Sequence, residues 1–583
     1  MNQKKITLDL SNLSIDQTKD FNTCLIEHRK DFDQMLYKLS REKDLHPDVF
    51  FTSIFSREPE FSPLYERCCQ LSFIKKHVEL GTVQQIIIDD LDIYEVLRES
   101  NIIKSSGVKI LCNEDSLRHF LKIFLPIRNL FRSFLISVFM LLASRKIKID
   151  ELIEKELILF STNILRGSIE NNQNSSYSDR NFPNIEDYIP SEARERLVFL
   201  PQFPGGPRPY NKIFQKLRDN QKSFLIKADY FKLTDYLYAL SYPFRINFKS
   251  VSTVEYLDFD IKPLIAREFW QTTFDFKIIE SLMNCKIFMR LKERGIKISV
   301  FIDWYENQLS SKGLIYGFKQ NYPKSKNIGY CGIIDSASYR INLHPSEYEN
   351  DQSLIPDKIL VLGEDIKNDF MEFTKSLNIA TTPSLRYKYL HDIDRLSKEG
   401  SCFNILVALP IFKVQSENIL SIVAESLESF QEMGGIRVNI KVHPTKTPDA
   451  YKSLLGIESE NYGFIDDDFF ECIRATDLLI TSASTTCMEA LAIGVPVAII
   501  GAKNQILQNP IPKSIDDEYW SICYSSTELI GFTKIIQKIE KNDLKTGLGR
   551  IKDSYFKIPT EQNIKELINI TNVLRGPEEE NNA

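Results

Sequence analysis

The sequence predicts an α/β protein with two layered domains built on parallel sheets, a helical N-terminal region and a helical insertion. Short runs of β-branched residues alternate with helical stretches in two separate series, which is typical of parallel sheets covered by helices. The 583 residues amount to about four times a typical domain of roughly 150 residues. A hydrophobic content of 43% and a charged content of 26% are typical of a folded globular chain.

The first series predicts a helical N-terminal region followed by an α/β domain. Residues 1–80 are rich in charged side chains, have helical periodicity and lack a catalytic motif. The first α/β domain is expected over residues 81–385, with a mostly helical insertion at about 115–170. Its strands are expected at 83–88, 108–112, 197–200, 223–226, 298–302, 328–331 and 359–362.

The second series begins after Ser401 and predicts a second α/β domain over residues 386–560. Its strands are expected at 403–409, 436–442, 477–481 and 495–500, and its helices at 417–432, 468–475 and 486–493. An amphipathic helix at 560–574 closes the chain, so residues 561–583 are expected to form a C-terminal helix and tail. Ligands of such domains bind outside the carboxyl ends of the strands, and we therefore expect the site in a cleft between the two domains.

Several functional classes lose support from the sequence. The net charge of −6 lacks the basic excess of a typical nucleic-acid-binding protein. The chain contains no GxGxxG, GxxxxGK[ST] or HExxH motif, and its ten cysteines show no CxxC pair or zinc-site spacing. The N-terminus lacks the apolar core of a signal peptide. We expect a cytoplasmic location, with no nucleic-acid partner, no cofactor and no required metal.

One segment raises the question of a membrane. Residues 134–143 form an apolar run of ten residues with basic residues on both sides. As a helix this run is about 15 Å long, roughly half the thickness of a bilayer core, so it is not expected to span. A buried core helix and a helix lying on an anionic membrane surface both stay open. Peripheral contact with the cytoplasmic face of the inner membrane is therefore an open alternative.

The second half of the chain carries the strongest candidate for a ligand site. The expected strand at 436–442 leads directly into His443 and Pro444, and proline ends the strand ladder there. About forty residues later, the strand at 477–481 leads into a turn rich in hydroxyl groups that opens a helix. Free N–H groups, the positive end of the helix dipole and hydroxyl donors favour an anion such as the phosphate of a nucleotide. The candidate ligand-binding residues of this turn and helix are Ser482, Ser484, Thr485, Thr486 and Glu489. A simpler interpretation is that Thr486 and Glu489 form only a capping box.

These motifs, with Gly494-Val495-Pro496 after them, resemble the donor half of GT-B glycosyltransferases. They are most similar to those of bacterial sialyltransferases and Kdo transferases, whose HP and Ser/Thr motifs hold a CMP-sugar. The resemblance implies a GT-B-like α/β fold, with two Rossmann-type domains facing a cleft, and a nucleotide-sugar donor.

A narrower resemblance covers the first domain as well. The segments 304–308, 329–330, 355–357 and 383–387 are similar to an uncharacterised family of bacterial surface-carbohydrate biosynthesis proteins, and they occur in the expected order. Together the resemblances cover roughly residues 195–505. The sequence departs from that family at 331–335, where a histidine is expected and none is present.

Sugar transfer needs a carboxylate, as a base on the acceptor hydroxyl or as a nucleophile on the anomeric carbon. Asp303 and Glu306 follow the expected strand 298–302 and are placed for this role, although a helix-start carboxylate is an equal alternative for Glu306. Arg386 could bind a carboxylate or phosphate of the donor, or form an interdomain salt bridge. A rival motif, Asp90-x-Asp92, is typical of metal-dependent GT-A enzymes, but Asp at the end of a first strand is also a common helix cap.

The resemblance implies a metal-independent glycosyltransferase that moves a CMP-activated, sialic-acid-like or Kdo-like sugar. The implied partners are a nucleotide-sugar donor and a glycan or lipid-linked glycan acceptor of the bacterial surface. A UDP-sugar-dependent GT-B transferase, a CDP-glycerol-type phosphotransferase, a sugar-nucleotide epimerase and a non-enzymatic polysaccharide-assembly protein stay open as alternatives.

Overall fold

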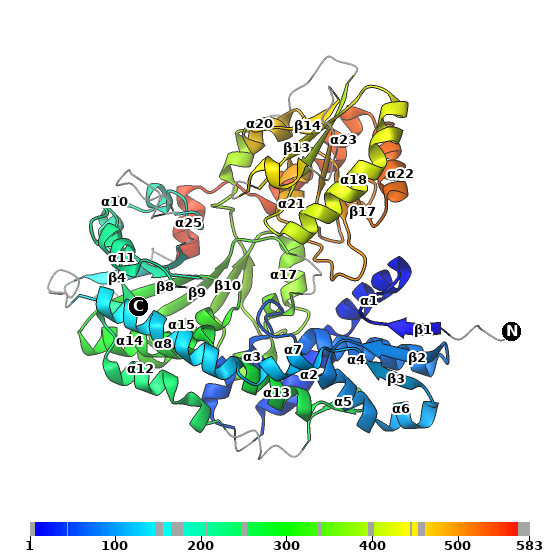
Figure 1. Ribbon diagram of the computed structural model, residues 1–583. Helices are drawn as coiled ribbons and strands as arrows, with labels where there is room; N and C mark the ends of the chain where they lie inside the picture. The colour runs from blue at the N-terminus through cyan, green and yellow to red at the C-terminus, as the bar shows by residue number, and fades with distance from the viewer. Residues whose placement is uncertain are drawn as a thin grey trace.

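The computed structural model describes residues 6–42, 45–145, 155–164, 169, 179–204, 207–246, 253–335, 340–393, 402–443, 446–452 and 461–568. Three parallel sheets organise these residues, one small sheet near the N-terminus and one six-stranded sheet in each of two larger domains (Figure 1). A short antiparallel ribbon, β6 (Glu255–Tyr256) and β7 (Phe259–Asp260), accompanies them.

The N-terminal sheet has the strand order β1 (Ile6–Asp9), β2 (Val83–Ile88) and β3 (Lys109–Cys112). The sequence predicts that the second and third of these strands belong to the first α/β domain, whereas in the structure they pair with β1 in a sheet of their own. Periodicity identifies a short strand but not its partner, and β1 has only four residues. The helices of this region are α1 (Ile15–Glu27), α2 (Arg29–Ser40), α3 (Ser53–Ser56), α4 (Leu64–Glu79), α5 (Leu91–Glu99) and α6 (Asn101–Ser106), with a 3-10 turn η1 (Pro47–Phe51).

The second sheet has the order β11-β10-β9-β8-β4-β5, and all its pairs are parallel. The chain changes direction across this sheet between β4 and β8, which makes their carboxyl ends the topological switch point. The strands are β4 (Glu156–Asn163), β5 (Leu197–Gln202), β8 (Lys297–Trp304), β9 (Lys326–Cys331), β10 (Lys358–Val361) and β11 (Ile379–Thr381).

The expected helical insertion is shorter than predicted. Helices α7 (Ser116–Lys122) and α8 (Leu125–Ala143) form it, but the β4 segment, counted as part of the insertion, lies between β8 and β5 in the second sheet. The expected strand at 223–226 contributes only one bridge, between Phe199 and Phe224. The helices of this domain are α10 (Ser191–Arg194), α11 (Tyr210–Arg218), α12 (Leu233–Leu240), α13 (Lys262–Thr272), α14 (Phe276–Glu293), α15 (Leu309–Asn321), α16 (Glu347–Asp351) and α17 (Glu364–Phe370). Its 3-10 turns are η2 (Ile185–Tyr188), η3 (Lys227–Asp229), η4 (Tyr242–Phe244), η6 (Ile341–Leu343) and η7 (Lys388–His391).

The third sheet has the order β14-β13-β12-β15-β16-β17, which in chain order is the 3-2-1-4-5-6 arrangement of Rossmann domains. Its switch point lies between β12 and β15, where Ala408 pairs with Thr481 at the ends of the two strands. The strands are β12 (Phe403–Ala408), β13 (Ile436–Lys441), β14 (Tyr462–Phe464), β15 (Leu478–Thr481), β16 (Val497–Ile500) and β17 (Trp520–Cys523). The two six-stranded sheets confirm the predicted α/β, GT-B-like fold with two Rossmann-type domains.

The C-terminal part of the chain returns to the first domain. Helices α18 (Lys413–Met433), α20 (Phe469–Arg474), α21 (Thr486–Ala492) and α22 (Ser526–Ile536) belong to the third sheet, with a 3-10 turn η8 (Pro448–Ala450). After α23 (Lys541–Leu548) and α24 (Arg550–Tyr555), helix α25 (Glu561–Ile568) contacts η2 beside the second sheet (Figure 1). The last part of the expected helix at 560–574 lies outside the described residues.

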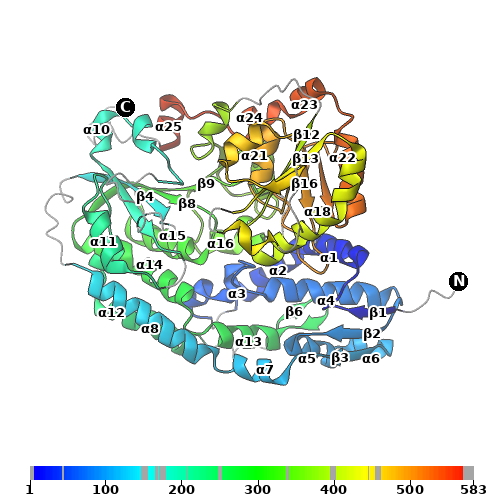
Figure 2. The same cartoon turned by 45° about the horizontal axis from the view of Figure 1, so that its top comes forward.

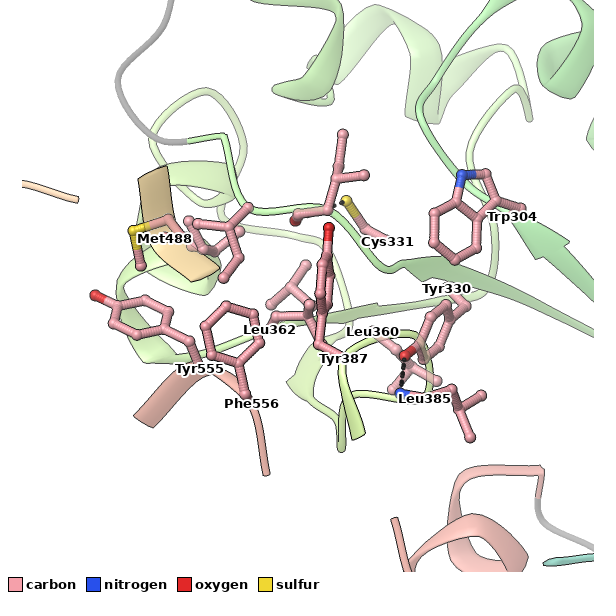
Figure 3. Packing of buried hydrophobic residues seen from close by; sticks show 14 of the residues in the cluster. Trp304, Tyr330, Cys331, Leu360, Leu362, Leu385, Tyr387, Met488, Tyr555 and Phe556 are labelled. Atoms are coloured by element: carbon pink, nitrogen blue, oxygen red, sulfur yellow. Dashed lines mark hydrogen bonds between the residues drawn. The ribbon is translucent and has the colours of Figure 1, made fainter. Parts of the chain in front are cut away.

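The two large domains share one hydrophobic core. Trp304 and Tyr330 of the second sheet pack in the same cluster as Met488 of α21, with Tyr387 and Phe556 in the cluster as well (Figure 3). The hydroxyl of Tyr330 accepts a hydrogen bond from the N–H of Leu385 at 3.0 Å, which fixes the connection between the domains. This shared core holds the strand ends of the two sheets in a defined relation.

The N-terminal region braces both domains (Figure 2). Arg57 is fully buried and donates to Glu349 of α16 at 2.8 Å. On the other side, the N–H of Asn504 donates to the Thr18 hydroxyl at 2.9 Å, and the N–H of Leu507 donates to the Asn22 side chain at 2.9 Å. The bonds from Asn504 and Leu507 connect the loop after β16 with α1. The ion pair of Arg57 connects the residues before α4 with α16.

Candidate active site

The Glu306 carboxylate lies just beyond the end of β8 and is held by three donors. The Trp304 indole N–H donates to Oε1 at 2.8 Å, and the Gln308 amide donates to Oε2 at 3.1 Å. Arg340 places a guanidinium nitrogen 3.5 Å from Oε2. The side chain is 19% exposed, so it keeps access to a ligand. Bonds of this kind fix the orientation of the carboxylate.

The loop that follows β8 takes a backbone shape that its neighbours enforce. Asn307 has φ +49°, in the left-handed region that a non-glycine residue adopts at a cost. Its buried amide donates to the Asn342 carbonyl at 2.8 Å and to the Glu349 carboxylate at 3.1 Å. The Asn342 amide in turn donates to the Glu306 carbonyl at 2.9 Å. The backbone on both sides of the Glu306 side chain is therefore fixed.

The support of this loop extends into the N-terminal region. Glu349 is completely buried and pairs with Lys312 at 2.6 Å and Arg57 at 2.8 Å. Although burial alone would raise the pKa of Glu349, the positive charges of Lys312 and Arg57 hold this pKa below its ordinary value. Residues 1–80, which carried no catalytic signal in the sequence, thus support the loop that presents Glu306.

The segment 331–335, where the expected histidine is absent, has a packing role. Gly332 lies against the Trp304 indole so closely that a Cβ at this position would overlap the ring. Asp335 lies 3.5 Å from the guanidinium of Arg340, the same arginine that approaches Glu306. The segment therefore positions two of the three donors to Glu306.

Asp303, the other predicted carboxylate, is buried behind this loop. Burial raises the pKa of Asp303 to about 7, and the negative charge of Glu306 acts in the same direction. Hydrogen bonds from Ser311 and Ser161 and the positive charge of Lys227 act in the opposite direction. A carboxyl group with a pKa near neutrality can gain or lose a proton under working conditions. Its burial keeps it from touching a large substrate, so Glu306 is the carboxylate that a ligand can reach.

Basic groups from both domains gather near these carboxylates. Arg180 precedes η2, and its pKa is lowered by desolvation and by the positive charge of Arg386, while Glu489 and Glu306 raise it. Arg180 therefore lies within electrostatic range of carboxylates from both domains. The His443 imidazole, two residues beyond the end of β13, has its pKa lowered by desolvation, by Arg180 and by Lys446. The structure thus brings His443, Arg386, Glu489 and Glu306 into one electrostatic neighbourhood.

The hydroxyl-rich turn after β15 is not used to cap its helix. Thr485 occupies the N-cap position of α21, and its side chain makes no capping hydrogen bond. Instead, the Thr485 hydroxyl interacts with Tyr387 and Glu489. Glu489 accepts a hydrogen bond from the Tyr389 hydroxyl at 2.9 Å, and burial raises the pKa of this carboxyl. The predicted alternative of a Thr486–Glu489 capping box is therefore wrong.

The other members of the turn are arranged around its backbone. The Ser484 hydroxyl accepts from the Thr486 N–H at 3.2 Å, and the Ser482 carbonyl accepts from the Cys487 thiol at 3.5 Å. Ser482 is buried, whereas Ser484, Thr485 and Thr486 are half-buried. Pro444, the remaining predicted residue of the site, lies outside the described residues.

A cavity of about 140 Å³ lies at the switch point of the third sheet. Phe412 follows β12, Ser482 and Ala483 follow β15, and Ile500 and Ala502 lie at the end of β16. Four amide side chains also line the cavity, namely Gln415, Asn418, Gln505 and Gln508, together with Glu60, Ile506 and Leu507. Amides both donate and accept hydrogen bonds, which suits the polar edge of a nucleobase or the hydroxyls of a ribose.

A second cavity, of about 180 Å³, lies at the switch point of the second sheet. Asn163 and Gln202 are the last residues of β4 and β5, and Gln308 belongs to the loop that holds Glu306. Arg132 of α8 and Lys277 of α14 also line it. Each of the two Rossmann-type sheets therefore has a polar cavity where its topology predicts one.

The rival metal motif has a structural role. Asp90 caps α5 by accepting from the N–H groups of Asp92 and Ile93, and it pairs with Arg67 at 2.8 Å. Asp92 is buried and pairs with Arg67 at 3.2 Å and with Arg267 at 3.1 Å. Both carboxylates are thus engaged in a helix start and in ion pairs. In the part of the chain that the structure describes, no group of three or more His, Cys, Asp or Glu side chains could hold a metal ion.

Sequence analysis missed the groups that connect the predicted residues. Arg180 lies next to an Asn/Ser-rich stretch without periodicity, Arg340 lies in an irregular segment, and Tyr389 lies in the short 3-10 turn η7. Their roles come from contacts with residues far away in the chain, which no local pattern encodes. One sequence signal pointed to this region, namely the resemblance of residues 383–387 to the carbohydrate-biosynthesis family. This segment contains Arg386 and ends two residues before Tyr389.

No protein-family model and no curated protein matches the sequence. Among solved structures, a putative UDP-N-acetylglucosamine 2-epimerase from Listeria monocytogenes is similar at a TM-score of 0.42 and 12% identity, covering 72% of this chain and 98% of that one. The lipopolysaccharide outer core galactosyltransferase WaaB in its apo form has a TM-score of 0.40 and 11% identity, covering 71% and 100%. The calicheamicin glycosyltransferase CalG4 has a TM-score of 0.40 and 10% identity, covering 72% and 100%.

Proposed function

We propose that the protein is a GT-B-type glycosyltransferase that moves a sugar from a nucleotide donor to a glycan acceptor of the bacterial surface. The observation that carries this proposal is the arrangement around Arg180, which lies within electrostatic range of Glu306 on one domain and of His443 and Glu489 on the other. A cationic group between a positioned carboxylate and a hydroxyl-rich turn suits a substrate that is both a sugar and a phosphate ester.

In the proposed complex, the second α/β domain, which contains the third sheet, binds the nucleotide. Its phosphate accepts hydrogen bonds from the guanidinium groups of Arg180 and Arg386 and from the hydroxyls of the turn after β15. The pKa of His443 is below its ordinary value, so the free protein holds a neutral imidazole that donates one hydrogen bond to the phosphate. As the bond between the sugar and the phosphate breaks, these donors stabilise the charge that develops on the departing oxygen. This arrangement supplies that stabilisation without a metal ion.

The Glu306 carboxylate is the proposed base. The acceptor hydroxyl oxygen forms a bond to the anomeric carbon, the bond from this carbon to the phosphate oxygen breaks, and the hydroxyl proton passes to Glu306. Gln308 and Arg340 both approach Oε2 of Glu306, whereas Oε1 has a lone pair beyond the bond from Trp304 and can accept the proton. Asp303 is too deeply buried to touch the acceptor.

The preferred donor is a CMP-activated, sialic-acid-like or Kdo-like sugar, and this preference rests on the HP and Ser/Thr motifs alone. A thermal-shift panel of CMP, CDP, UDP and GDP ranks the nucleotides, because a ligand at 100 times its dissociation constant adds about 2.7 kcal/mol. We expect CMP to give the largest shift. A larger shift with UDP would replace the CMP preference but keep the nucleotide site, whereas no shift with any nucleotide would contradict the proposed function.

Two further measurements test the mechanism. His443→Ala should lower the rate of transfer by about 10²–10⁴-fold while leaving the melting temperature unchanged, because the imidazole is half-buried at a strand end. Transfer should persist in excess EDTA. Loss of transfer in EDTA with recovery in Mn²⁺ would contradict the metal-independent mechanism.

A sugar-nucleotide epimerase is the second candidate, favoured by one observation. Asp303, whose pKa burial raises to about 7, and Glu306 are neighbouring carboxyl groups, and in an epimerase Glu306 would contact the sugar while the buried Asp303 would exchange a proton with it. An epimerase converts its nucleotide-sugar without an acceptor, whereas a transferase releases the nucleotide only when an acceptor is present. Product analysis with and without acceptor therefore separates the two.

A further inference from the structure

Helices α7 and α8 present an unusually apolar face to solvent. Ile127, Phe131 and Leu142 are 66%, 66% and 69% exposed. The same two helices and the turn between them carry nine more exposed large apolar side chains: Leu117, Phe120, Leu121, Ile123, Phe124, Leu130, Phe134, Phe139 and Leu141. Soluble monomers rarely expose apolar side chains as a contiguous set of this kind, so this surface, which we call the α7–α8 face, needs a partner.

The inner side of α8 is polar, which reverses the usual pattern of a surface helix. The buried Asn129 amide donates to the carbonyls of Gln271 and Thr273 at 3.0 and 3.3 Å. The buried Ser133 hydroxyl donates to the Phe274 carbonyl at 2.7 Å. Apart from Ile136, the buried side chains of α8 are polar or small, whereas most of its large apolar side chains are exposed. The sequence expectation of a buried core helix is therefore wrong.

The charge of this segment favours an anionic surface. Between Asp115 and Asp150 the chain contains no acidic residue, although the whole protein carries a net charge of −6. The same stretch contains seven basic residues: Arg118, Lys122, Arg128, Arg132, Arg145, Lys146 and Lys148. Among the described residues, Arg128 and Arg132 are exposed and have no acidic side chain within salt-bridge distance. Basic and aromatic side chains around an apolar face are typical of helices that lie in a membrane interface.

The geometry of α8 favours lying on a membrane over crossing it. The helix has 19 residues and a mean hydropathy of 1.5, which by length and composition would allow it to span. However, the Asn129 and Ser133 bonds attach its inner side to residues 271–274, and α8 also contacts α11, α13 and α14. In Figure 2, α7 and α8 lie along the lower edge of the molecule. Trp270 of α13 is half exposed and donates its indole N–H to the Ile123 carbonyl at 3.2 Å, as an interfacial tryptophan at the rim would.

We propose that the α7–α8 face docks the protein on an anionic lipid bilayer, with α8 parallel to the membrane plane. The exposed phenylalanines and leucines enter the boundary of the acyl chains, and the basic residues contact lipid phosphates. A second copy of this chain is a poorer occupant, because pairing two such faces would bring like positive charges together.

Docking also places a cavity beside the membrane. Arg132 of α8 lines the 180 Å³ cavity at the carboxyl ends of β4 and β5, near the loop that holds Glu306. If the proposed function holds, a lipid-linked acceptor could enter this cavity from the bilayer. The docking itself is independent of that function and is measured without any sugar substrate.

The test is co-flotation of the purified full chain with vesicles. One set contains phosphatidylcholine alone, and the other contains phosphatidylcholine with phosphatidylglycerol. We expect binding to the anionic vesicles to exceed binding to the neutral ones by about tenfold or more at low salt, and high salt to reduce it. The triple variant Ile127→Glu, Phe131→Glu, Leu142→Glu should lose binding, and Arg128→Gln with Arg145→Gln should lose the anionic preference.

The control variant is Val414→Glu with Ile535→Glu, which changes two exposed apolar residues on α18 and α22 and should bind like the unmodified protein. Melting temperatures of all variants show that each still folds, since the substituted apolar side chains are exposed. Equal binding to neutral and anionic vesicles would overturn the proposal. So would absence of vesicle binding together with a dimer that the triple variant abolishes, because the face would then join two copies of the chain.

Discussion

The loop after β8 and the turn after β15 follow strands at the switch points of two similar sheets, yet they are built in opposite ways. The loop after β8 uses its polar groups within the protein, where Glu306 accepts from Trp304 and Gln308 and Asn307 bonds to Asn342 and Glu349. In the turn after β15, the N-cap residue Thr485 makes no capping bond to α21, and only the Ser484 hydroxyl accepts from a helix N–H, that of Thr486. The polar groups of the loop after β8 are bonded within the protein, whereas the turn after β15 presents hydroxyl groups that a ligand could contact.

The difference matches the two tasks that we propose. A base must be held in one orientation before the substrate arrives, because misplacement by about 1 Å can cost 10²-fold in rate. A phosphate-binding turn contacts its phosphate only when the ligand is bound. Its N-cap residue can therefore lack a capping bond in the free protein. We therefore expect changes to the β8 loop to affect catalysis and changes to the β15 turn to affect binding.

Glu306→Gln should have the largest effect. Glutamine keeps the size of the side chain but cannot accept the acceptor proton, so the rate of transfer should fall by about 10²–10⁴-fold. Nucleotide affinity, measured by calorimetry, should stay within a few-fold because the nucleotide binds to the other domain. The control Asp92→Asn removes a charge of the ion pair with Arg67 and should affect transfer only mildly. A larger loss with Asp92→Asn than with Glu306→Gln would contradict the assignment of the base.

Ser484→Ala combined with Thr485→Ala should have an intermediate effect, on binding. Nucleotide affinity should fall, because the turn loses two donors to the phosphate. Stability should fall only by what the Ser484 bond to the Thr486 N–H and the Thr485 contacts with Tyr387 and Glu489 contribute. The matched control is Ser525→Ala, since the Ser525 hydroxyl caps α22 by accepting from the Glu528 N–H at 3.3 Å. This control should lose about 0.5–2 kcal/mol of stability with unchanged nucleotide affinity. If the double variant behaves like the control, the turn is only a structural cap.

Asp303→Asn should have the smallest effect, one of pH on stability. Burial raises the pKa of Asp303 to about 7, so between about pH 4 and pH 7 the folded protein keeps a proton that the unfolded chain loses. The free energy of unfolding therefore falls as pH rises through this window, by up to about 1.4 kcal/mol per pH unit. Asparagine cannot ionise and removes this dependence. Thermal melts should show the variant gaining stability over the unmodified protein as pH rises, and a constant difference would show that Asp303 does not titrate there.

The sequence predicted the repeating α/β pattern well and the tertiary connections poorly. The strands that end before His443 and Ser482 could be predicted, because buried parallel strands are continuous apolar runs, although β8 extends through Asp303 to Trp304, two residues beyond the expected end. The pairing of β1 with β2 and the position of β4 in the second sheet could not, because the partner of a strand is set by packing of distant segments.

The candidate site shows the same limit. Residues that follow strands were found from the sequence, whereas Arg180 and Arg340 were missed because they reach the site from irregular segments. The inverted amphipathic pattern of α8 was also hidden, since an apolar run does not reveal which side of the helix faces the protein. Asn129 and Ser133 identify that side only once the Gln271, Thr273 and Phe274 carbonyls are placed.

The central claim, that Arg180 and Arg386 bind the phosphate of a nucleotide donor, is tested most directly by calorimetry on Arg386→Ala and Arg180→Ala. Titration with cytidine and with CMP separates the contribution of the phosphate from that of the nucleoside. We predict that each variant lowers CMP affinity by about tenfold or more, as expected for charge-assisted bonds, while the weaker cytidine affinity stays unchanged. Arg294→Ala, an exposed arginine of the first domain, serves as the control and should change neither. Equal CMP affinity in Arg180→Ala, Arg386→Ala and the unmodified protein would contradict the account.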